Sequence, residues 1–258
     1  MKELIKKLLG YLNLKIIQKS YFDEFNGCVQ CIELLKAISP DYRSNVIQYL
    51  EESKSQLYQD LFVLSELGFK KKGFFVEFGA SCGLSLSNSF LLETKFNWQG
   101  ILAEPAKVWH DQLKKNRNAI IETDCVWKRT GDTLSFNETK IGELSTINYF
   151  SKLDMHKKQR RNGNIYDVKT ISLEDMLSKF KAPNFIDYLS IDTEGSEFEI
   201  LENFNFDRYK FKIITCEHNY SADRKKIYNL LINNGYQRKF VELSKWDDWY
   251  VLSDSYFF

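Results

Sequence analysis

Long hydrophobic runs, paired cysteines and a surplus of charge of one sign are all missing from this sequence of 258 residues. No apolar run is long enough to cross a bilayer, and residues 1–20 mix lysines with leucine and isoleucine without the pattern of a secretory signal. The five cysteines are odd in number and scattered, which argues against a disulfide framework or a structural zinc site. These absences predict a cytoplasmic protein with reduced cysteines.

The charges nearly cancel, because 36 basic and 35 acidic residues leave a net charge of +1. Such a chain has no overall field to attract nucleic acid, and it lacks a stripe of interleaved basic and aromatic residues, so we expect no nucleic-acid partner. What the sequence does contain is 43% hydrophobic residues, and aromatic residues make up 15% of the chain. A chain of this length and composition can bury one large core rich in aromatic side chains.

The pattern of apolar residues divides the chain at about residue 54. Residues 1–54 have helical spacing, with a break at Pro40, and predict a helical cap or an oligomerisation segment, so a homodimer is one expectation. The first 20 residues predict a helix that packs on the rest of the chain or on a partner subunit. A helix lying on a membrane surface is the alternative, so any membrane contact should be peripheral.

Residues 55–258 predict one α/β domain. A helix that starts at Ser55 ends at Gly68, and from Gly73 short apolar strands alternate with helices, which is typical of a parallel sheet covered by helices on both faces. The last two strands have no helix between them and predict a hairpin with one antiparallel strand. Residues 145–164 are polar and predict a mobile loop. The expected strands are 74–78, 100–104, 120–127, 188–192, 212–217, 236–241 and 249–252, and the expected helices after Gly68 are 84–95, 106–116, 173–180, 197–204 and 222–234.

A glycine-containing turn follows the first strand and has the pattern E-x-G-x-x-x-G, formed by Glu77, Gly79 and Gly83. In open α/β sheets, ligands bind beyond the carboxyl ends of the strands, and Glu104 at the end of the next strand has the spacing of a ribose-binding acid. A carboxylate at Glu77 would repel a pyrophosphate but attract a sulfonium. The pattern therefore favours S-adenosylmethionine over a dinucleotide.

A second group of polar residues follows two later strands. Asp192 and Glu194 come after one strand, and Glu217, His218 and Asn219 come after the next. Adjacent parallel strands lie about 5 Å apart, so we expect these side chains to converge at the same edge of the sheet. The acids Glu197 and Glu199 are interpreted as solvated helix residues.

These motifs resemble the FkbM-type methyltransferase family over about residues 55–220. The resemblance is carried by residues 76–80 (VEFGA), 101–105 (ILAEP) and 191–197 (IDTEGSE), with a similar Ser55-Gln56-x-x-Gln59-Asp60 upstream. It implies a class I methyltransferase fold, a Rossmann-like three-layer sandwich whose seven-stranded, mostly parallel sheet ends in an antiparallel strand. The cofactor would be S-adenosyl-L-methionine. The residues that the resemblance assigns to its binding are Glu77, Gly79, Ala80 and Gly83 on the methionine side, Glu104 and Pro105 at the ribose, Asp124 and Cys125 at the adenine, and Gln59, Asp60 and Asp192 near the methionine end.

Methyl transfer to a hydroxyl needs a base within hydrogen-bond reach, and His218, Asp192 and Glu217 are the candidates. A divalent Mg or Mn ion held by Asp192, Glu217 and His218 is the competing hypothesis. Family members typically methylate oxygens of sugars or of polyketide-like products. The candidate acceptor is a nucleotide-linked sugar or a precursor of a surface or capsular polysaccharide, whose phosphates a basic loop could bind. The substrate-binding candidates are His156, Arg160, Arg161, Glu194 and Asn219.

Three other functions remain open at this point. The acceptor could be a small natural product other than a sugar, or the domain could bind the cofactor without catalysis. A nicotinamide-dependent oxidoreductase is less favoured, because the glycine pattern that accommodates a pyrophosphate is missing.

Overall fold

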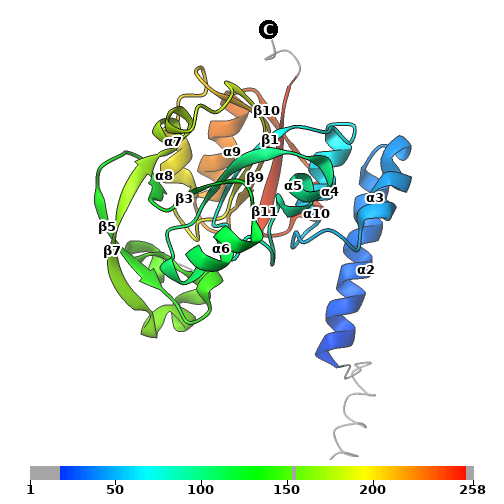
Figure 1. Cartoon of the computed structure of the whole chain (residues 1–258). Coiled ribbons are helices and arrows are strands. Elements are labelled where there is room, and N and C mark those ends of the chain that lie inside the picture. The colour runs from blue at the N-terminus through cyan, green and yellow to red at the C-terminus, as the bar shows by residue number, and fades with distance from the viewer. Residues whose placement is uncertain (1–17, 153–154, 254–258) are drawn as a thin grey trace, which may run out of the picture.

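Seven strands form the central sheet of the computed structural model, which describes residues 18–152 and 155–253. Their order across the sheet is β10-β11-β9-β8-β1-β2-β3 (Figure 1). The first five strands of this sheet along the chain pair in parallel, whereas β11 runs antiparallel to both β9 and β10. This confirms the predicted mostly parallel sheet with an antiparallel last strand. The bounds are β1 Phe74–Phe78, β2 Gln99–Ala103, β3 Ile120–Glu122, β8 Phe185–Ile191, β9 Lys210–Glu217, β10 Tyr236–Lys239 and β11 Asp247–Leu252.

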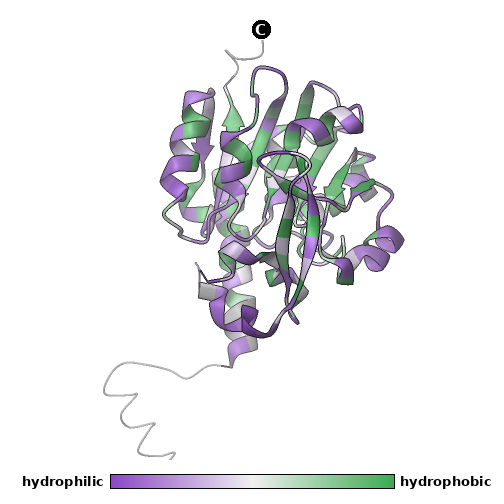
Figure 2. Ribbon diagram, turned by 90° about the vertical axis from the view of Figure 1, so that its left-hand side faces the viewer, coloured by the Kyte–Doolittle hydropathy of each residue, from purple (hydrophilic) through white to green (hydrophobic). Residues whose placement is uncertain are grey.

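Helices cover both faces of this sheet, so the fold has three layers. On one face, α7 (Leu173–Lys179), α8 (Glu197–Glu202) and α9 (Arg224–Asn233) bury Met176, Ile200 and Leu231 against strand side chains such as Val76. On the other face lie α4 (Gln59–Glu66), α5 (Phe90–Phe96) and α6 (His110–Asn116), whose apolar residues pack on Phe75. Successive strand residues thus enter opposite cores, as the pleat requires. Figure 2 shows the apolar strands enclosed by helices with polar outer faces.

A second, four-stranded sheet lies beside the first and has the order β4-β7-β5-β6. The predicted mobile loop over residues 145–164 is wrong, because this stretch contains part of the second sheet and buries Phe150 and Arg160. The strand expected over residues 120–127 is divided, since its second half leaves the central sheet and pairs with β7. The elements are β4 Cys125–Trp127, β5 Thr133–Glu138, η3 Gly142–Leu144, β6 Thr146–Ile147, η4 Asn148–Lys152, η5 Met155–Asn162 and β7 Asn164–Ser172.

The helix expected over residues 84–95 begins only at Phe90. The preceding residues form a loop in which Leu86 has a φ of +60°. This loop is held down by Glu77, which accepts hydrogen bonds from the Ser87 hydroxyl, the Asn88 backbone N–H and the Ser89 hydroxyl. The helix expected over residues 106–116 is formed by η2 (Lys107–Trp109) followed by α6, whereas α10 (Val241–Ser244), which interrupts the terminal hairpin, was not expected.

The N-terminal part consists of α2 (Lys19–Ala37), η1 (Pro40–Tyr42) and α3 (Arg43–Tyr49). Leu34 and Ile38 join the core that α4, α5 and α6 form with the sheet. The helix expected over the first 20 residues lies almost entirely outside the described residues, and the division of the chain at residue 54 stays a prediction. Within residues 18–152 and 155–253, no helix is both long enough and apolar enough to span a membrane.

Candidate active site

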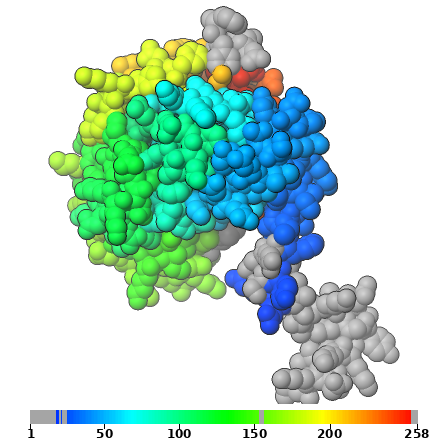
Figure 3. Space-filling view, turned by 45° about the vertical axis from the view of Figure 1, so that its right-hand side comes forward, coloured from blue at the N-terminus to red at the C-terminus, as the bar shows by residue number. Residues whose placement is uncertain are grey.

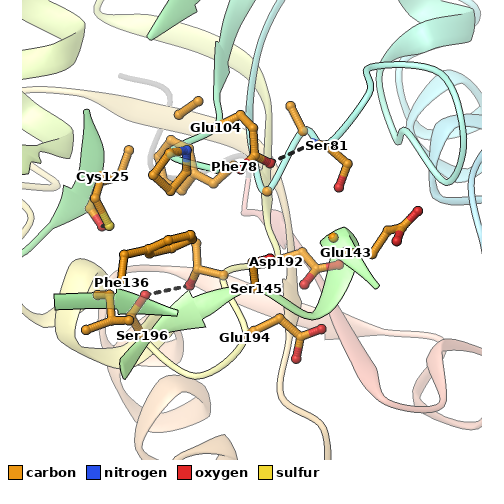
Figure 4. A pocket seen from close by; sticks show the side chains of 18 of the residues that line it. Phe78, Ser81, Glu104, Cys125, Phe136, Glu143, Ser145, Asp192, Glu194 and Ser196 are labelled. Carbon is orange, nitrogen blue, oxygen red and sulfur yellow. Dashed lines mark hydrogen bonds between the residues drawn. The ribbon is translucent and has the colours of Figure 1, made fainter. Parts of the chain in front are cut away.

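A partly open cavity, with about 780 Å³ of empty space that includes open solvent, lies at the carboxyl ends of β1, β2 and β8 (Figure 4). One part of its wall is apolar and includes Phe78, Val126, Phe136 and Ile147. The second sheet supplies three of these residues, Val126, Phe136 and Ile147, so both sheets are needed to enclose the cavity. The polar part of its wall includes Ser81, Glu104, Glu143, Ser145, Asp192 and Glu194.

Glu104 is the buried acid at one end of this cavity. Its Oε2 accepts a hydrogen bond from the Ser81 N–H at 2.8 Å, and its Oε1 accepts one from the Ala106 N–H at 2.7 Å. Burial raises the pKa of this carboxyl to about 7, and the same two backbone donors oppose the shift. Each carboxylate oxygen can accept a further hydrogen bond, so the group suits neutral hydroxyl donors such as those of a ribose.

Gly79 allows the turns after β1 and β8 to touch. Its φ is +70°, and a Cβ at this position would lie 1.9 Å from the Asp192 carbonyl oxygen. Only glycine can therefore occupy the position without displacing the backbone that carries Asp192. Gly79 thus brings the cavity's glycine turn against the strand end that supplies its acids.

Three carboxylates meet where this cavity joins two smaller ones. Asp192, Glu194 and Glu217 each offer an oxygen within 4.8 Å of the other two. The second cavity, of about 470 Å³, shares Glu194 with the first, while the third, of about 230 Å³, shares Asp192 with the first and Glu217 with the second. These three acids follow the adjacent strands β8 and β9, or end them, and they therefore lie where the three cavities meet.

The side chains of Asp192 and Glu217 lie close enough for a protonated Glu217 to donate a hydrogen bond to Asp192. Burial raises the pKa of Asp192 to about 6, and burial together with the nearby Asp192 raises the pKa of Glu217 well above its ordinary value. Two carboxyl groups this close in a buried place hold one proton between them. The shared proton belongs mainly to Glu217, which leaves the Asp192 carboxylate free to accept a second proton. A general base must be able to do this.

Glu194 is neutralised from the basic segment of the second sheet. The Arg160 guanidinium donates to its Oε2 at 2.8 Å and to the Leu144 carbonyl at 2.7 Å, and the side chain of Arg160 is fully buried. The Asn219 amide lies between Glu194 and Glu217 and donates to Glu217 Oε2 at 2.7 Å. Arg160 was predicted to bind substrate phosphates, but the structure places it behind Glu194. Arg161 is exposed and His156 half-buried, and neither lines the three cavities.

Replacing Arg160 with methionine is expected to destabilise the protein by about 3–5 kcal/mol, because Glu194 would keep a buried charge without its partner. Urea denaturation would measure the loss. The neighbouring variant Arg161→Met is the matched control, and a change of less than about 0.5 kcal/mol is expected for it because its side chain is exposed. The double variant Arg160→Met/Glu194→Gln should recover part of the stability. Equal stabilities of Arg160→Met and the unmodified protein would contradict this account.

His218 is placed differently from the prediction. Its Nδ1 accepts a hydrogen bond from the Tyr220 N–H at 2.9 Å, and burial lowers its pKa to about 4. The neutral ring therefore carries its proton on Nε2, which lies 3.8 Å from Asp248 Oδ1. Because its acceptor nitrogen is already used, His218 is unsuited to be the base or a metal ligand.

The place where Asp192, Glu194 and Glu217 meet is unsuited to a divalent cation. Glu194 Oε2 lies 2.8 Å from the Arg160 guanidinium, so a positive charge already occupies the cation side of this carboxylate. Glu217 Oε2 is bound by an amide N–H, and Glu217 also shares a proton with Asp192. A metal would have to displace these donors.

Other residues predicted to bind the cofactor are distributed over and beyond the large cavity. Ala80, Pro105 and Cys125 line it with Gly79 and Glu104. Glu77 and Gly83 do not, because Glu77 is occupied by the loop before α5, and Gly83 faces Arg117 and Leu113. Asp124 is half-buried outside the cavity wall. Gln59 lines the third cavity, and Asp60, bound to Ser53, lies outside all three.

Several residues at the site were missed by sequence reasoning. Glu197 is buried, which corrects its interpretation as a solvated residue, and its Oε1 accepts from the Thr193 and Gly195 N–H groups, so it caps the turn that presents Glu194. Asp247 in the third cavity is also buried, and burial raises its pKa to about 8. The serine-rich loop before α5 lines the large cavity through Ser85, Leu86 and Ser87, and its poor helix propensity was the available signal.

Comparison with known proteins places this site in context. A family model described as the methyltransferase FkbM domain matches residues 77–247. A methyltransferase FkbM from Methylobacillus flagellatus KT is 16% identical, with 88% of this chain and 59% of that chain covered and a TM-score of 0.48. A precorrin-6y C5,15-methyltransferase from Geobacter metallireducens GS-15 is 12% identical, with 70% and 72% covered and a TM-score of 0.40. No curated protein matches the chain.

Proposed function

The chain belongs to the FkbM methyltransferase family, and from this premise we propose that it is a methyltransferase that transfers the methyl group of S-adenosylmethionine to a sugar hydroxyl. The acceptor that we propose is a nucleotide-linked sugar or a precursor of a surface or capsular polysaccharide. One observation supports the proposal most directly, which is the meeting of Asp192, Glu194 and Glu217 where three cavities join. Family membership decides against the nicotinamide-dependent oxidoreductase.

The large cavity has the features that this cofactor requires. Glu104 is buried and bound only by neutral backbone donors among its described hydrogen bonds, so it can receive both ribose hydroxyls. The apolar wall formed by Phe78, Val126 and Phe136 suits a flat aromatic base. At the other end, Asp192 is the carboxylate that is ionised at neutral pH and has no cationic partner among its described contacts, so it favours a positively charged group. When bound, S-adenosylmethionine would supply a methyl group on a sulfonium, which is already a good leaving group.

The second cavity is the proposed acceptor site. Its wall contains the acids Glu194 and Glu217, which disfavour a phosphate, and Asn219, Ser221 and the neutral His218, which can hydrogen-bond to hydroxyl groups. Asp192 is the proposed base, because its carboxylate can take the proton that the hydroxyl loses as its oxygen attacks. The walls of this cavity also orient the hydroxyl, and this orientation increases the rate of transfer further.

The phosphates of a nucleotide-linked acceptor would lie outside this acidic cavity. The exposed side chains of Lys157, Lys158 and Arg161 on η5 are the candidates for binding them, whereas Arg160 is committed to Glu194. A lipid-linked or polymeric acceptor would need no such contact. The two acceptor types therefore differ in their dependence on these three side chains.

The deciding experiment incubates the full chain with isotope-labelled S-adenosylmethionine and a library of sugar nucleotides and surface-glycan precursors, followed by mass spectrometry. The expected result is one labelled methyl ether on one compound or one closely related group. Methylation of a small natural product from a parallel library, with no sugar labelled, would overturn the sugar acceptor but keep the methyltransferase activity. Cofactor binding without turnover on any acceptor would contradict catalysis.

Activity and stability are expected to change with pH in opposite directions. Below about pH 6 kcat should fall, because protonated Asp192 can no longer take the hydroxyl proton. The folded pKa values of Asp60, Glu104, Asp192 and Asp247 are all raised, to about 6, 7, 6 and 8. Raised carboxyl pKa values stabilise the fold at low pH, and this stability is lost as pH rises through them. The Tm of the ligand-free protein should therefore be higher at pH 5.5 than at pH 8, and a parallel fall of Tm and kcat on acidification would contradict this account.

A further inference from the structure

The helix α2 has one face that packs on the protein. Leu34 and Ile38 are almost fully buried in the core, and Gln30 donates from its side-chain amide to the Leu243 carbonyl of α10 at 2.7 Å. These residues recur every four positions, as expected for one side of a helix. Ordinary amphipathicity would leave the opposite side polar.

The opposite side of α2 is apolar as well. Tyr21, Phe25 and Ile32 are 68%, 63% and 51% exposed, and their spacing of four and seven residues aligns them on one stripe. Cys28 is exposed on the same stripe and Val29 beside it. Figures 1 and 3 show that the N-terminal part of α2 extends beyond the body of the protein, and the described residues leave this stripe exposed. Contiguous exposed apolar residues of this size mark an interaction surface.

Positive charge lies directly before this stripe in the chain. Residues 1–19 contain five lysines, Lys2, Lys6, Lys7, Lys15 and Lys19, against one glutamate, a net charge of +4, whereas the whole chain carries only +1. The chain therefore concentrates positive charge next to two exposed aromatic residues, Tyr21 and Phe25. Each lysine close to an anionic lipid surface contributes about 1 kcal/mol to binding.

We propose that α2, through the stripe of Tyr21, Phe25, Cys28 and Ile32, and the lysine-rich residues 1–19 together bind an anionic lipid surface. Tyrosine and phenylalanine favour the boundary between headgroups and acyl chains, where their rings are buried at little cost. A second copy of the chain could cover the stripe, but it would bring its own residues 1–19, which carry the same net charge of +4. An anionic membrane matches both features, and binding through α2 leaves the packing face with Leu34 in place.

Vesicle flotation of the full chain tests the proposal. The protein should float with vesicles of phosphatidylcholine and phosphatidylglycerol but not with phosphatidylcholine alone, and high salt should weaken the binding. The variant Tyr21→Ser/Phe25→Ser/Ile32→Ser should lower partitioning by about tenfold or more, because the apolar area of three side chains is lost. The variant Lys2→Gln/Lys6→Gln/Lys7→Gln should remove most of the salt dependence.

The matched control is Val108→Ser/Ile165→Ser, which removes side chains that are 52% and 57% exposed far from α2 in the sequence, and it should float like the unmodified protein. An unchanged Tm would show that the stripe variant is folded. Equal binding to neutral vesicles, no binding to anionic ones, or flotation unaffected by the stripe variant would overturn the proposal. Light scattering that finds a dimer lost in the stripe variant, without flotation of the unmodified protein, would assign the surface to a second copy instead. Each outcome is independent of methyl transfer.

Discussion

Replacement of Asp192 by asparagine is expected to lower kcat by about 100- to 10,000-fold, the range of a positioned general base. The side chain keeps its size and its place at the cavity junction, but the amide cannot take the hydroxyl proton. Affinity for S-adenosylhomocysteine should change little, since this product lacks the sulfonium charge. Single-turnover rates and calorimetric titration with S-adenosylhomocysteine would measure the two effects separately.

Two further measurements distinguish this role from a general structural one. The exposed acid Asp207 provides the matched control, and Asp207→Asn should keep kcat within about twofold. The residual activity of Asp192→Asn should no longer fall below pH 6, because the group that titrates there has been removed. An Asp192→Asn enzyme with unchanged kcat and the same acid limb would assign the base to another residue, with Glu217 as the next candidate.

Truncation of Glu104 to alanine should weaken binding of S-adenosylhomocysteine by about 100-fold or more, because two hydrogen bonds to a charged group contribute about 1.5–3 kcal/mol each. The truncation also leaves the Ser81 and Ala106 N–H groups without their acceptor. Glu104→Gln keeps one acceptor oxygen and should therefore lose less, by about tenfold. Calorimetry on both variants checks the order.

The conservative variant Glu104→Gln keeps the test interpretable if Glu104→Ala does not fold. If Glu104→Ala loses its cooperative thermal transition, Glu104→Gln still reports on the hydrogen bonds. The control is Glu138→Gln, which changes an acid that accepts from the Val108 N–H and the Tyr166 hydroxyl outside the cavity wall, and it should bind the product normally. Unchanged affinity in both Glu104 variants would show that the large cavity is not the cofactor site.

Much of the central fold could be predicted because its signals are local. Phe74–Phe78 and Phe185–Ile191 are short apolar runs bounded by turn residues, and buried parallel strands require that pattern. The second sheet could not be predicted in this way. Residues 164–172 read NIYDVKTIS, which alternates weakly, and they become a strand because β4 and β5 supply partners from distant parts of the chain.

The residues of the candidate site also fall into those that the sequence could predict and those that it could not. Glu104 and Asp192 could be placed from the sequence, because each directly follows a strand and the carboxyl ends of parallel strands meet at one edge. Glu77 has the same kind of position, yet it lies in the strand rather than after it, and the loop with Ser87 and Asn88 occupies it. The basic loop was assigned to phosphates on its composition, but composition does not reveal that Arg160 points inward.

The sequence by itself determined the layered α/β architecture, the glycine turn with Gly79 and the strand ends that carry Glu104 and Asp192. These follow from periodicity and from the steric freedom of glycine, which are properties of neighbouring residues. Only the tertiary structure decided the partners of the titratable groups. Arg160 pairs with Glu194, Asp192 lies against Glu217, and the Tyr220 N–H donates to His218. The physical reason is that the energy of a buried charge depends on what lies within a few ångströms of it, and that neighbourhood is assembled by segments far apart in the chain.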